Sequence, residues 1–259
     1  MLSALRRWRE QRIIRRFPYS ESDWERQFAS MPLLRGLTPD ECETLRELSV
    51  LFLHRKSLEG AQGLAIDLDM AVPLALQACL PILKLGLDWY NGWVSIVLYP
   101  EAFIPAHEEI DEFGVSHLNN EAIYSGESWQ HGAVVLAWSE AKQAALIDGH
   151  NLLIHEFAHK LDMLNGSANG FPPLHDDMDR AQWTDAFQYA YEDFQLHPRA
   201  GIDPYAGTAP AEFFAVISEV FFERPDIVDK HYPRVYVQLK RFYRQDPLTR
   251  LGKSSGVRP

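Results

Sequence analysis

The chain has 259 residues, of which 46% are hydrophobic and 12% aromatic, so it can close a substantial core and is not generally disordered. Its net charge of −11 argues against nucleic acid as the main ligand, because like charges repel. The two cysteines, Cys42 and Cys79, exclude a scaffold of several disulfides and favour a reducing, cytoplasmic compartment. The longest apolar stretch, 70–87, is interrupted by two prolines and Lys84, so we expect no membrane span.

The charge is concentrated at the N-terminus. Residues 1–17 hold six arginines and one glutamate, a local charge of +5, whereas the other 19 basic and 35 acidic residues give −16. This segment predicts either an arm that docks on an acidic partner or membrane surface, or a helix that lies on the acidic body of the protein. No secretory signal is expected, because Ile13-Ile14 is too short for its apolar region.

The remaining elements are taken in chain order. Thr38 and Glu41 form a capping box that predicts the start of a helix, with Leu45, Leu48 and Phe52 on one face. Strands are predicted at 94–99 and 132–138, the second entered through the turn-rich segment SGESWQHG. Helices are predicted from about 151 and at about 178–196, 210–223 and 231–245, loops at 165–177 and 197–209, and a disordered tail at 252–259. The mixture without regular βαβ alternation predicts an α+β fold with a small mixed sheet.

The motif His155-Glu156-Phe157-Ala158-His159 is the clearest functional signal. On a helix, residues four apart lie on one face, so both imidazoles can reach one zinc ion. Glu156 points about 100° away and can instead act as general base on a water that the metal activates. The apolar residues around the motif are typical of a buried active-site helix.

A catalytic zinc site needs a third protein ligand. The metzincin pattern fails, because it requires glycine at 162 and histidine or aspartate at 165, where the chain has Asp162 and Asn165. A glutamate on a later helix is the other solution. Spacing leaves three candidates open, Glu212, Glu219 and Glu223.

Four other polar residues, three histidines and Asp162, are considered as ligands or as residues that support the ligands. His131, His150 and His175 are rival ligands by type, but none has a partner at helical spacing, so we expect them at the surface or behind the ligands. Asp162 is expected either to orient a ligand imidazole or to make local hydrogen bonds at the helix end. A purely structural zinc site is disfavoured, because such sites usually use four Cys or His ligands.

The segments HEFAHKLD, DPYA…PAEFFAVISE and SGESWQHGAVVLAW resemble the Mlc titration factor A family of bacterial zinc metallopeptidases, related in their catalytic part to anthrax lethal factor. The resemblance extends from about residue 32 to about 251. It implies one zinc ion per chain held by His155, His159 and Glu212, with Glu156 as general base and Tyr205 as hydrogen-bond donor to the oxyanion.

The resemblance also implies an overall function. We expect an α+β, single zincin-like metallopeptidase domain at 18–251, with the basic arm or helix at 1–17 and the tail at 252–259. Its expected substrate is a peptide or protein that lies along the strand 132–138 as a sheet edge. Aminopeptidase and endopeptidase action both remain open. The family further implies binding of the transcriptional repressor Mlc, and the alternative function is a non-catalytic protein that sequesters this repressor.

One position departs from the family pattern. Relatives tend to have an aspartate that could cap the helix where this chain has Ala209. We expect Thr208 to supply the cap instead, at a small cost in stability and none in chemistry.

Overall fold

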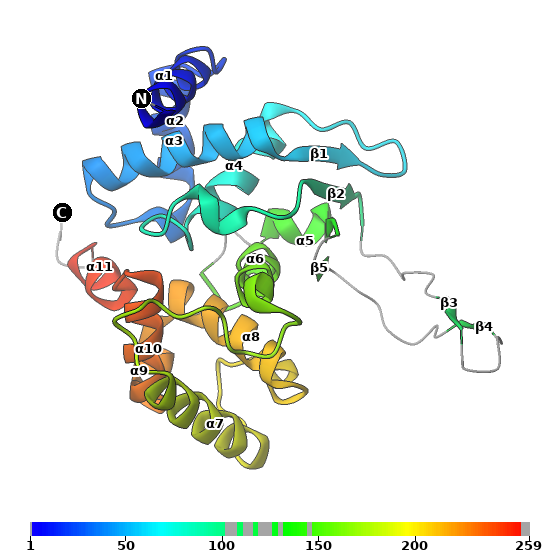
Figure 1. Ribbon diagram of the computed structural model, residues 1–259, viewed down its shortest axis with the longest axis vertical. Helices are drawn as coiled ribbons and strands as arrows, with labels where there is room; N and C mark the ends of the chain where they lie inside the picture. The colour runs from blue at the N-terminus through cyan, green and yellow to red at the C-terminus, as the bar shows by residue number, and fades with distance from the viewer. Residues whose placement is uncertain are drawn as a thin grey trace.

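The computed structural model describes residues 2–101, 108–110, 116–118, 126–128, 132–143 and 147–254 (Figure 1). The described elements are predominantly helical with a small sheet, so the predicted α+β class is confirmed. The helices are α1 (Leu2–Arg15), α2 (Glu21–Ser30), α3 (Pro39–Arg55), α4 (Leu68–Cys79), α5 (Trp138–Gln143), α6 (Leu152–Asp162), α7 (Arg180–Leu196), α8 (Pro210–Glu223), α9 (Pro225–His231), α10 (Pro233–Tyr243) and α11 (Pro247–Ser254). Short 3-10 helices are η1 (Pro32–Leu34), η2 (Leu87–Tyr90), η3 (Met163–Asn165) and η4 (Pro204–Gly207). The strands are β1 (Ser57–Gly60), β2 (Ser95–Tyr99), β3 (Glu108–Ile110), β4 (Ser116–Leu118), β5 (Gly126–Ser128) and β6 (Val134–Ala137).

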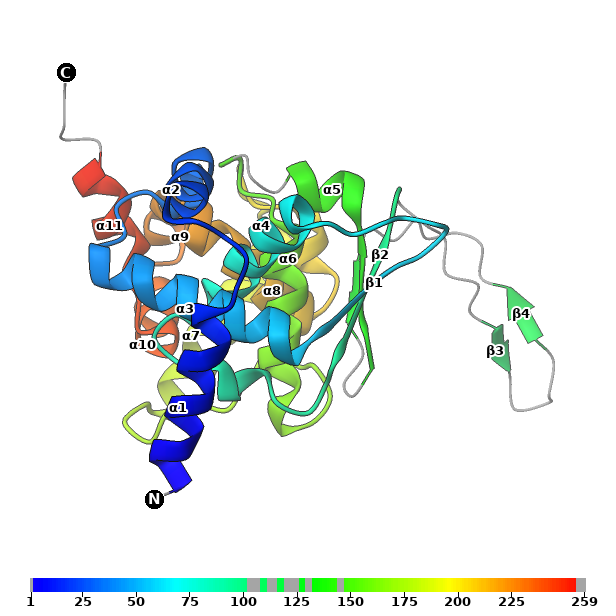
Figure 2. The ribbon, with the colours of Figure 1, turned by 90° about the horizontal axis from the view of Figure 1, so that it is seen from above.

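The main sheet has the order β1-β2-β6-β5 and is mixed. β1 and β2 are parallel, β2 and β6 are parallel, and β5 is antiparallel to β6. In the register of the central pair, Ile96 lies opposite Val134 and Leu98 opposite Leu136, and all four are fully buried. Figure 2 shows this sheet at one side of the helical body. A separate antiparallel pair joins β3 and β4.

The predicted strand at 132–138 is confirmed as β6, but its expected role as a sheet edge is wrong. β6 is hydrogen-bonded on both sides, to β2 and to β5, so its backbone has no free edge for an extended peptide. The segment that we expected to be only a turn contains β5, which occupies the edge instead. Glycine and serine weaken the local strand signal, and pairing with β6 overrides it.

Helix α4 is not indicated by the sequence patterns. The apolar stretch near 70–87 contains α4, which connects the parallel strands β1 and β2 as a crossover helix. Its N-terminal cap is Asp67, whose side chain accepts from the N–H of Met70. Residues on almost every side of α4 are buried, so the helix lacks the amphipathic period by which it could be recognised.

No helix of the described residues is long and apolar enough to cross a membrane.

The predicted helix from 39 onward is confirmed as α3. Thr38 and Glu41 form the expected capping box: the Thr38 hydroxyl accepts from the Glu41 N–H, and the Glu41 carboxylate accepts from the Thr38 N–H. Leu45 and Phe52 are fully buried. The side chain of Phe52 contacts the ring of Phe157 on α6, with ring centroids 5.7 Å apart. The predicted start of this helix and the burial of Leu45 and Phe52 on its apolar face are therefore both found in the structure.

Helix α6 lies at the centre of the molecule, where it contacts α4, α8, β5 and β6 (Figure 1). Phe157 packs against Tyr90 and Trp93, with ring centroids 5.2 and 5.8 Å apart. Lys160 is also buried; it donates to the carbonyl oxygen of Gly132 at 3.0 Å, and burial lowers its pKa to about 8. The close packing of Phe157 therefore holds α6, which carries the HEFAH motif, rigidly in the core.

The two ends of the chain lie on the surface of this body. α1 is a helix that contacts α3 and is tied to the body by Arg6 to Asp88 at 2.8 Å and by Glu10 to Arg55 at 2.7 Å. At the other end, α11 extends to Ser254 and so takes in the first three residues of the expected tail. Residues 255–259 lie outside the described residues.

Candidate metal centre

The start of helix α6 fixes the orientation of the HEFAH motif. The Asn151 side chain caps the helix, accepting from the N–H of Ile154 at 3.0 Å. His155 and His159 then fall one turn apart on the same face, as the four-residue spacing predicts. Their Nε2 atoms lie 3.2 Å apart.

Helix α8 brings a carboxylate to the same point. Oε2 of Glu212 is 3.1 Å from Nε2 of His155 and 3.2 Å from Nε2 of His159. The three atoms therefore form a nearly equilateral triangle. Of the described residues, these three form the group of potential metal ligands whose donor atoms lie close together.

The triangle fits a tetrahedral zinc ion. Zinc binds histidine nitrogen and carboxylate oxygen at about 2.0–2.2 Å, so neighbouring ligand atoms in a tetrahedron lie about 3.3 Å apart. Distances of 3.1–3.2 Å match one face of such a tetrahedron. A three-residue face leaves the fourth position open, which is the arrangement of catalytic rather than structural zinc.

Glu219 contacts the other nitrogen of His155. Its Oε1 accepts from Nδ1 of His155 at 2.7 Å, while its Oε2 accepts from the backbone N–H of Asn151 at 2.6 Å. A proton held on Nδ1 leaves the lone pair of His155 on Nε2, the atom that faces His159 and Glu212. Glu219 was one of three open candidates for the third ligand, and the structure places it behind the first ligand instead.

Glu223 supports the loop before α6. Its carboxylate accepts from the backbone N–H of Gly149 and from the side-chain amide of Asn151, both at 2.9 Å. The amide of Asn151 also donates to Gln77 on α4 at 3.1 Å. Burial raises the pKa of Glu223 to about 8. The sequence order alone did not indicate this network, because its members come from two separate helices, α4 and α8, and from the loop before α6.

The charges at the centre perturb one another. Burial acts to lower the pKa of His155, but hydrogen bonds to Glu212 and Glu219 outweigh it and raise the pKa well above its usual value. Burial acts to raise the pKa of Glu212, but its bonds to His155 and His159 lower it to about 2. Glu212 is therefore an anion at neutral pH, which favours a cation at the triangle.

The two expected catalytic side chains have different surroundings. Glu156 is 3% exposed, its Oε2 has no hydrogen-bond partner within the described part of the chain, and burial raises its pKa. A buried carboxylate oxygen without a partner destabilises the fold, and such groups are typical of functional sites. Tyr205, on η4, is 48% exposed, and its ring centroid is 6.2 Å from that of His155. Glu156 interacts electrostatically with His155, His159 and Glu212, and Tyr205 lies beside the His155 ring, so both side chains border the centre.

Asp162 makes the local bonds that we considered for it. Its Oδ2 accepts from the backbone N–H groups of Asn169 and Gly170, both at 2.7 Å. Gly170 has φ +76°, and a Cβ there would lie 2.5 Å from the carbonyl oxygen of Pro210, where α8 begins. Asp162 therefore holds the loop that abuts the helix carrying Glu212.

The other histidines are not part of the triangle. His150 is exposed and lies 3.5 Å from Asp203. Nε2 of His175 is 2.8 Å from the carbonyl oxygen of Phe242. The remaining rival, His131, lies outside the described residues.

The expectation for the cap of α8 is wrong. Ala209 is the N-cap residue and provides no side-chain hydrogen bond. The Thr208 hydroxyl donates to the carbonyl oxygen of Tyr205 at 2.7 Å and therefore faces back into η4 rather than toward α8. Pro210 at the first helical position removes one N–H that would need a partner, and so reduces the need for a cap.

Comparison with known proteins identifies the family. The model of the glucose-regulated metallo-peptidase M90 family matches residues 5–244. The chain belongs to this family. It is 39% identical over 234 residues to Mlc titration factor A of Cronobacter sakazakii (strain ATCC BAA-894), which covers 88% of each chain. It is also 39% identical over 254 residues to Mlc titration factor A of Salmonella arizonae (strain ATCC BAA-731 / CDC346-86 / RSK2980), covering 94% of this chain and 98% of the relative.

A third relative gives the same result. Mlc titration factor A of Escherichia coli O9:H4 (strain HS) is 39% identical over 235 residues, which covers 87% of each chain. The family resemblance found in the sequence is thus confirmed, and membership of a metallopeptidase family agrees with a metal at the triangle.

Proposed function

We propose that this protein is a zinc-dependent peptidase whose single zinc ion is held by His155, His159 and Glu212. The observation that carries the proposal is the triangle of their ligand atoms, with sides of 3.1–3.2 Å. It is supported by the membership of a metallopeptidase family. In this proposal residues 18–251 form one zincin-like domain.

In the proposed reaction, the metal, Glu156 and Tyr205 have different roles. A bound zinc ion would polarise the scissile carbonyl and lower the pKa of a water toward 7. Glu156, buried beside the triangle, takes the proton of the attacking water and delivers it to the leaving amine. Tyr205 donates its phenol O–H to the oxyanion that develops on the carbonyl. Its exposure is consistent with a donor that meets the substrate at the surface of the site.

The test combines metal analysis with turnover. Purified protein is expected to contain one zinc per chain and to hydrolyse chromogenic peptides. Glu156→Gln should keep the zinc, because the amide has nearly the same shape and position 156 is not a ligand, yet lose at least about 10² in turnover. Activity of this variant within a few-fold of wild type would remove Glu156 from the mechanism.

The same assay addresses where the peptide is cut. Amino-acid anilides with a free N-terminus report aminopeptidase action, and internally quenched peptides with blocked ends report endopeptidase action. We propose a peptide or protein substrate for either case. Strand β6 is paired on both sides, so an extended peptide would use an edge strand. Of the two edge strands, β1 and β5, we propose β5, because it contacts α6, which carries the histidines.

A second proposed function is binding of the repressor Mlc. It rests on the name of the relatives, Mlc titration factor A, which are 39% identical over most of the chain. Such binding needs no turnover, so purified Mlc should bind wild type and Glu156→Gln with equal affinity. Loss of binding in this variant would tie the two functions to one site, whereas binding without any peptidase activity would favour a non-catalytic regulator.

We also propose a cytoplasmic location. It is supported by the two cysteines, Cys42 and Cys79, which are both free thiols. Fractionation of cells that express the protein at native level would test it, with the membrane and periplasmic fractions as the contradicting outcomes.

A further inference from the structure

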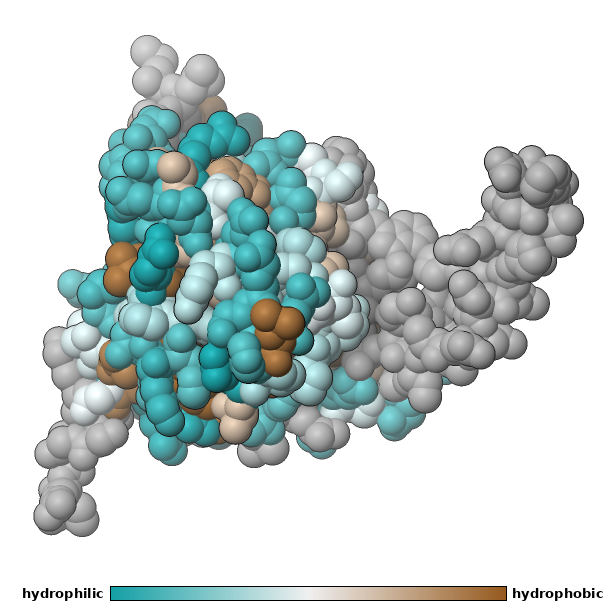
Figure 3. Space-filling view, turned by 90° about the horizontal axis from the view of Figure 1, so that it is seen from below, coloured by the Kyte–Doolittle hydropathy of each residue, from teal (hydrophilic) through white to brown (hydrophobic). Residues whose placement is uncertain are grey.

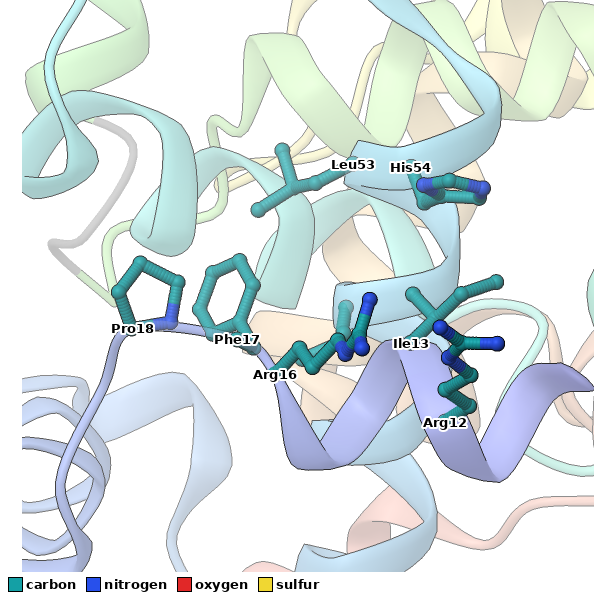
Figure 4. A pocket seen from close by; sticks show the side chains of 8 residues that line it. Arg12, Ile13, Arg16, Phe17, Pro18, Leu53 and His54 are labelled. Carbon is teal, nitrogen blue, oxygen red and sulfur yellow. The ribbon is translucent and has the colours of Figure 1, made fainter.

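A cavity of about 400 Å³, open to solvent, lies between the end of α1 and the last two turns of α3, away from the metal centre. Its volume is within the range of sites that bind small molecules. Figure 4 shows Phe17 and Pro18 at one side of the cavity and Ile13 at the other. No residue of the metal centre lines it, so any ligand here would be independent of the peptidase chemistry.

Three basic side chains line this cavity, Arg12, Arg16 and His54. Arg12 and Arg16 are one helical turn apart and exposed. None of the ion pairs between described residues includes either arginine, and the one cation–π contact, from Arg12, is to Trp8 at 5.8 Å. Arg12 lies in the last turn of α1 and Arg16 just beyond its end, so a bound anion would offset the repulsion between the two like charges.

The other arginines show that pairing is available in this region. Arg6, on the same helix, lies 2.8 Å from Asp88 and 3.1 Å from Glu10, and Arg55 on α3 lies 2.7 Å from Glu10. These pairs hold α1 to the body. Arg12 and Arg16 do not take part in them, although the protein as a whole carries a charge of −11.

The floor of the cavity is apolar. Val50 is 2% exposed, and Ile13, Phe17 and Leu53 are partly buried against the core. An inorganic anion would bind the arginines and leave the apolar floor exposed to water. An acidic head group with an apolar tail would bind the arginines and also cover the floor.

We propose that this cavity binds a small amphiphilic anion, with its phosphate or carboxylate on Arg12 and Arg16 and its apolar tail on Leu53 and Phe17. Arginine suits such a head group because its planar fork can donate two hydrogen bonds to one oxyanion. The tail is short, because the open cavity has a volume of only about 400 Å³, which holds a molecule of ordinary ligand size.

Titration calorimetry with octyl phosphate tests this proposal, with inorganic phosphate and octanol as the head-only and tail-only probes. Wild type is expected to bind one octyl phosphate per chain, at least 10-fold more tightly than either partial probe. Added salt should weaken binding, because the contact is charged. The double variant Arg12→Gln/Arg16→Gln should bind at least 10-fold more weakly.

The matched control is Arg7→Gln/Arg9→Gln, which removes the same charge from exposed positions of the same helix outside the cavity. It should bind within about twofold of wild type. An equal loss in both double variants would reduce the effect to the overall charge of α1 and overturn the site. Octanol binding as tightly as octyl phosphate, or no saturable binding, would overturn it as well. Circular dichroism melts establish that both variants fold.

Discussion

Glu212 and Glu219 lie two turns apart on α8, and their carboxylates contact opposite nitrogens of His155. Glu212 is 3.1 Å from Nε2, and Glu219 is 2.7 Å from Nδ1. Only the Nε2 side also carries His159. At the scale of single residues, the two glutamates thus have separable effects: one completes the ligand set, and the other orients the imidazole.

Substitutions of these two glutamates should differ in their effect on metal content. Glu212→Ala is expected to lose zinc and activity together, because it removes one of three ligands. Glu219→Ala should keep the metal, with an affinity lower by about 10- to 100-fold, since it removes only the bond that orients His155. Metal-to-protein ratios after dialysis against a weak chelator measure both.

The outcome that contradicts this assignment is the reverse order. A Glu212→Ala protein that keeps one zinc, beside a Glu219→Ala protein that keeps none, would place the third ligand at Glu219, two turns further along α8. Far-ultraviolet circular dichroism is the control for folding of each variant.

At the scale of elements, α8 starts without a side-chain cap at Ala209, although Glu212 stands at the third helical position. Ala209→Ser supplies an oxygen for the free N–H groups and is expected to raise the free energy of unfolding by about 1 kcal/mol. Urea unfolding followed by circular dichroism measures the change. Ala209→Val, which adds side-chain atoms but no oxygen and is as poor an N-cap as alanine, is the matched control.

The cap variant also tests how firmly Glu212 is held. Serine and glutamate three residues apart can form a capping box, which would draw the Glu212 carboxylate toward the backbone. We expect zinc content to stay at one per chain, because His155 and His159 hold this carboxylate. Loss of zinc in Ala209→Ser would show that the cap competes with the metal centre.

The junction of α10 and α11 depends on Asp246. Its carboxylate accepts from Lys240 at 2.6 Å, from the Tyr236 hydroxyl at 2.7 Å and from the N–H of Thr249 at 3.1 Å. Burial acts to raise the pKa of Asp246, but these bonds outweigh it and hold the pKa well below its usual value. The charged form therefore stabilises the folded state.

Asp246→Asn should lower the free energy of unfolding by about 1–2 kcal/mol at pH 7. Because the folded pKa lies below the unfolded pKa, the stabilisation is complete above about pH 4 and is lost as the pH falls through the folded pKa. The difference between wild type and variant should therefore shrink below about pH 4. Urea unfolding over this pH range measures it, with the exposed Asp185→Asn as the control for charge alone. If the difference in free energy of unfolding between wild type and Asp246→Asn did not change with pH, the charge of Asp246 would not be its cause.

At the scale of the whole molecule, the basic N-terminal helix and the metal centre lie in different places. Figure 3 shows one face that is mostly hydrophilic, with hydrophobic residues in small separate patches. α1 lies on this body through α3, whereas the metal centre is built from α6 and α8. The basic segment and the site are thus separate parts of the molecule.

Deletion of residues 1–17 should accordingly leave zinc content and peptide turnover unchanged. It should lower the free energy of unfolding by at least about 2 kcal/mol, because Ile13, Ile14 and Phe17 pack against the core and would be lost. The exposed ion pairs of α1 contribute little to this loss. Thermal melts and metal analysis of the truncated protein measure both quantities. Loss of catalysis in a truncated protein that still folds would contradict the separation.

The sequence by itself determined the features that depend on neighbours along the chain. The pairing of His155 with His159 follows from the helical period, and the start of α3 follows from the reciprocal bonds of Thr38 and Glu41. These interactions span three or four residues, so a local pattern contains all of their members.

Tertiary structure alone decided the features that join distant segments. Spacing along α8 left Glu212, Glu219 and Glu223 as equal candidates, and the packing of α8 on α6 assigned each a different partner. Strand β6 is an interior strand because β5 pairs with it. Helix α4 is buried on almost every side because neighbouring elements enclose it. A local pattern records the type of each side chain but not which remote group it meets, and remote contacts set these roles.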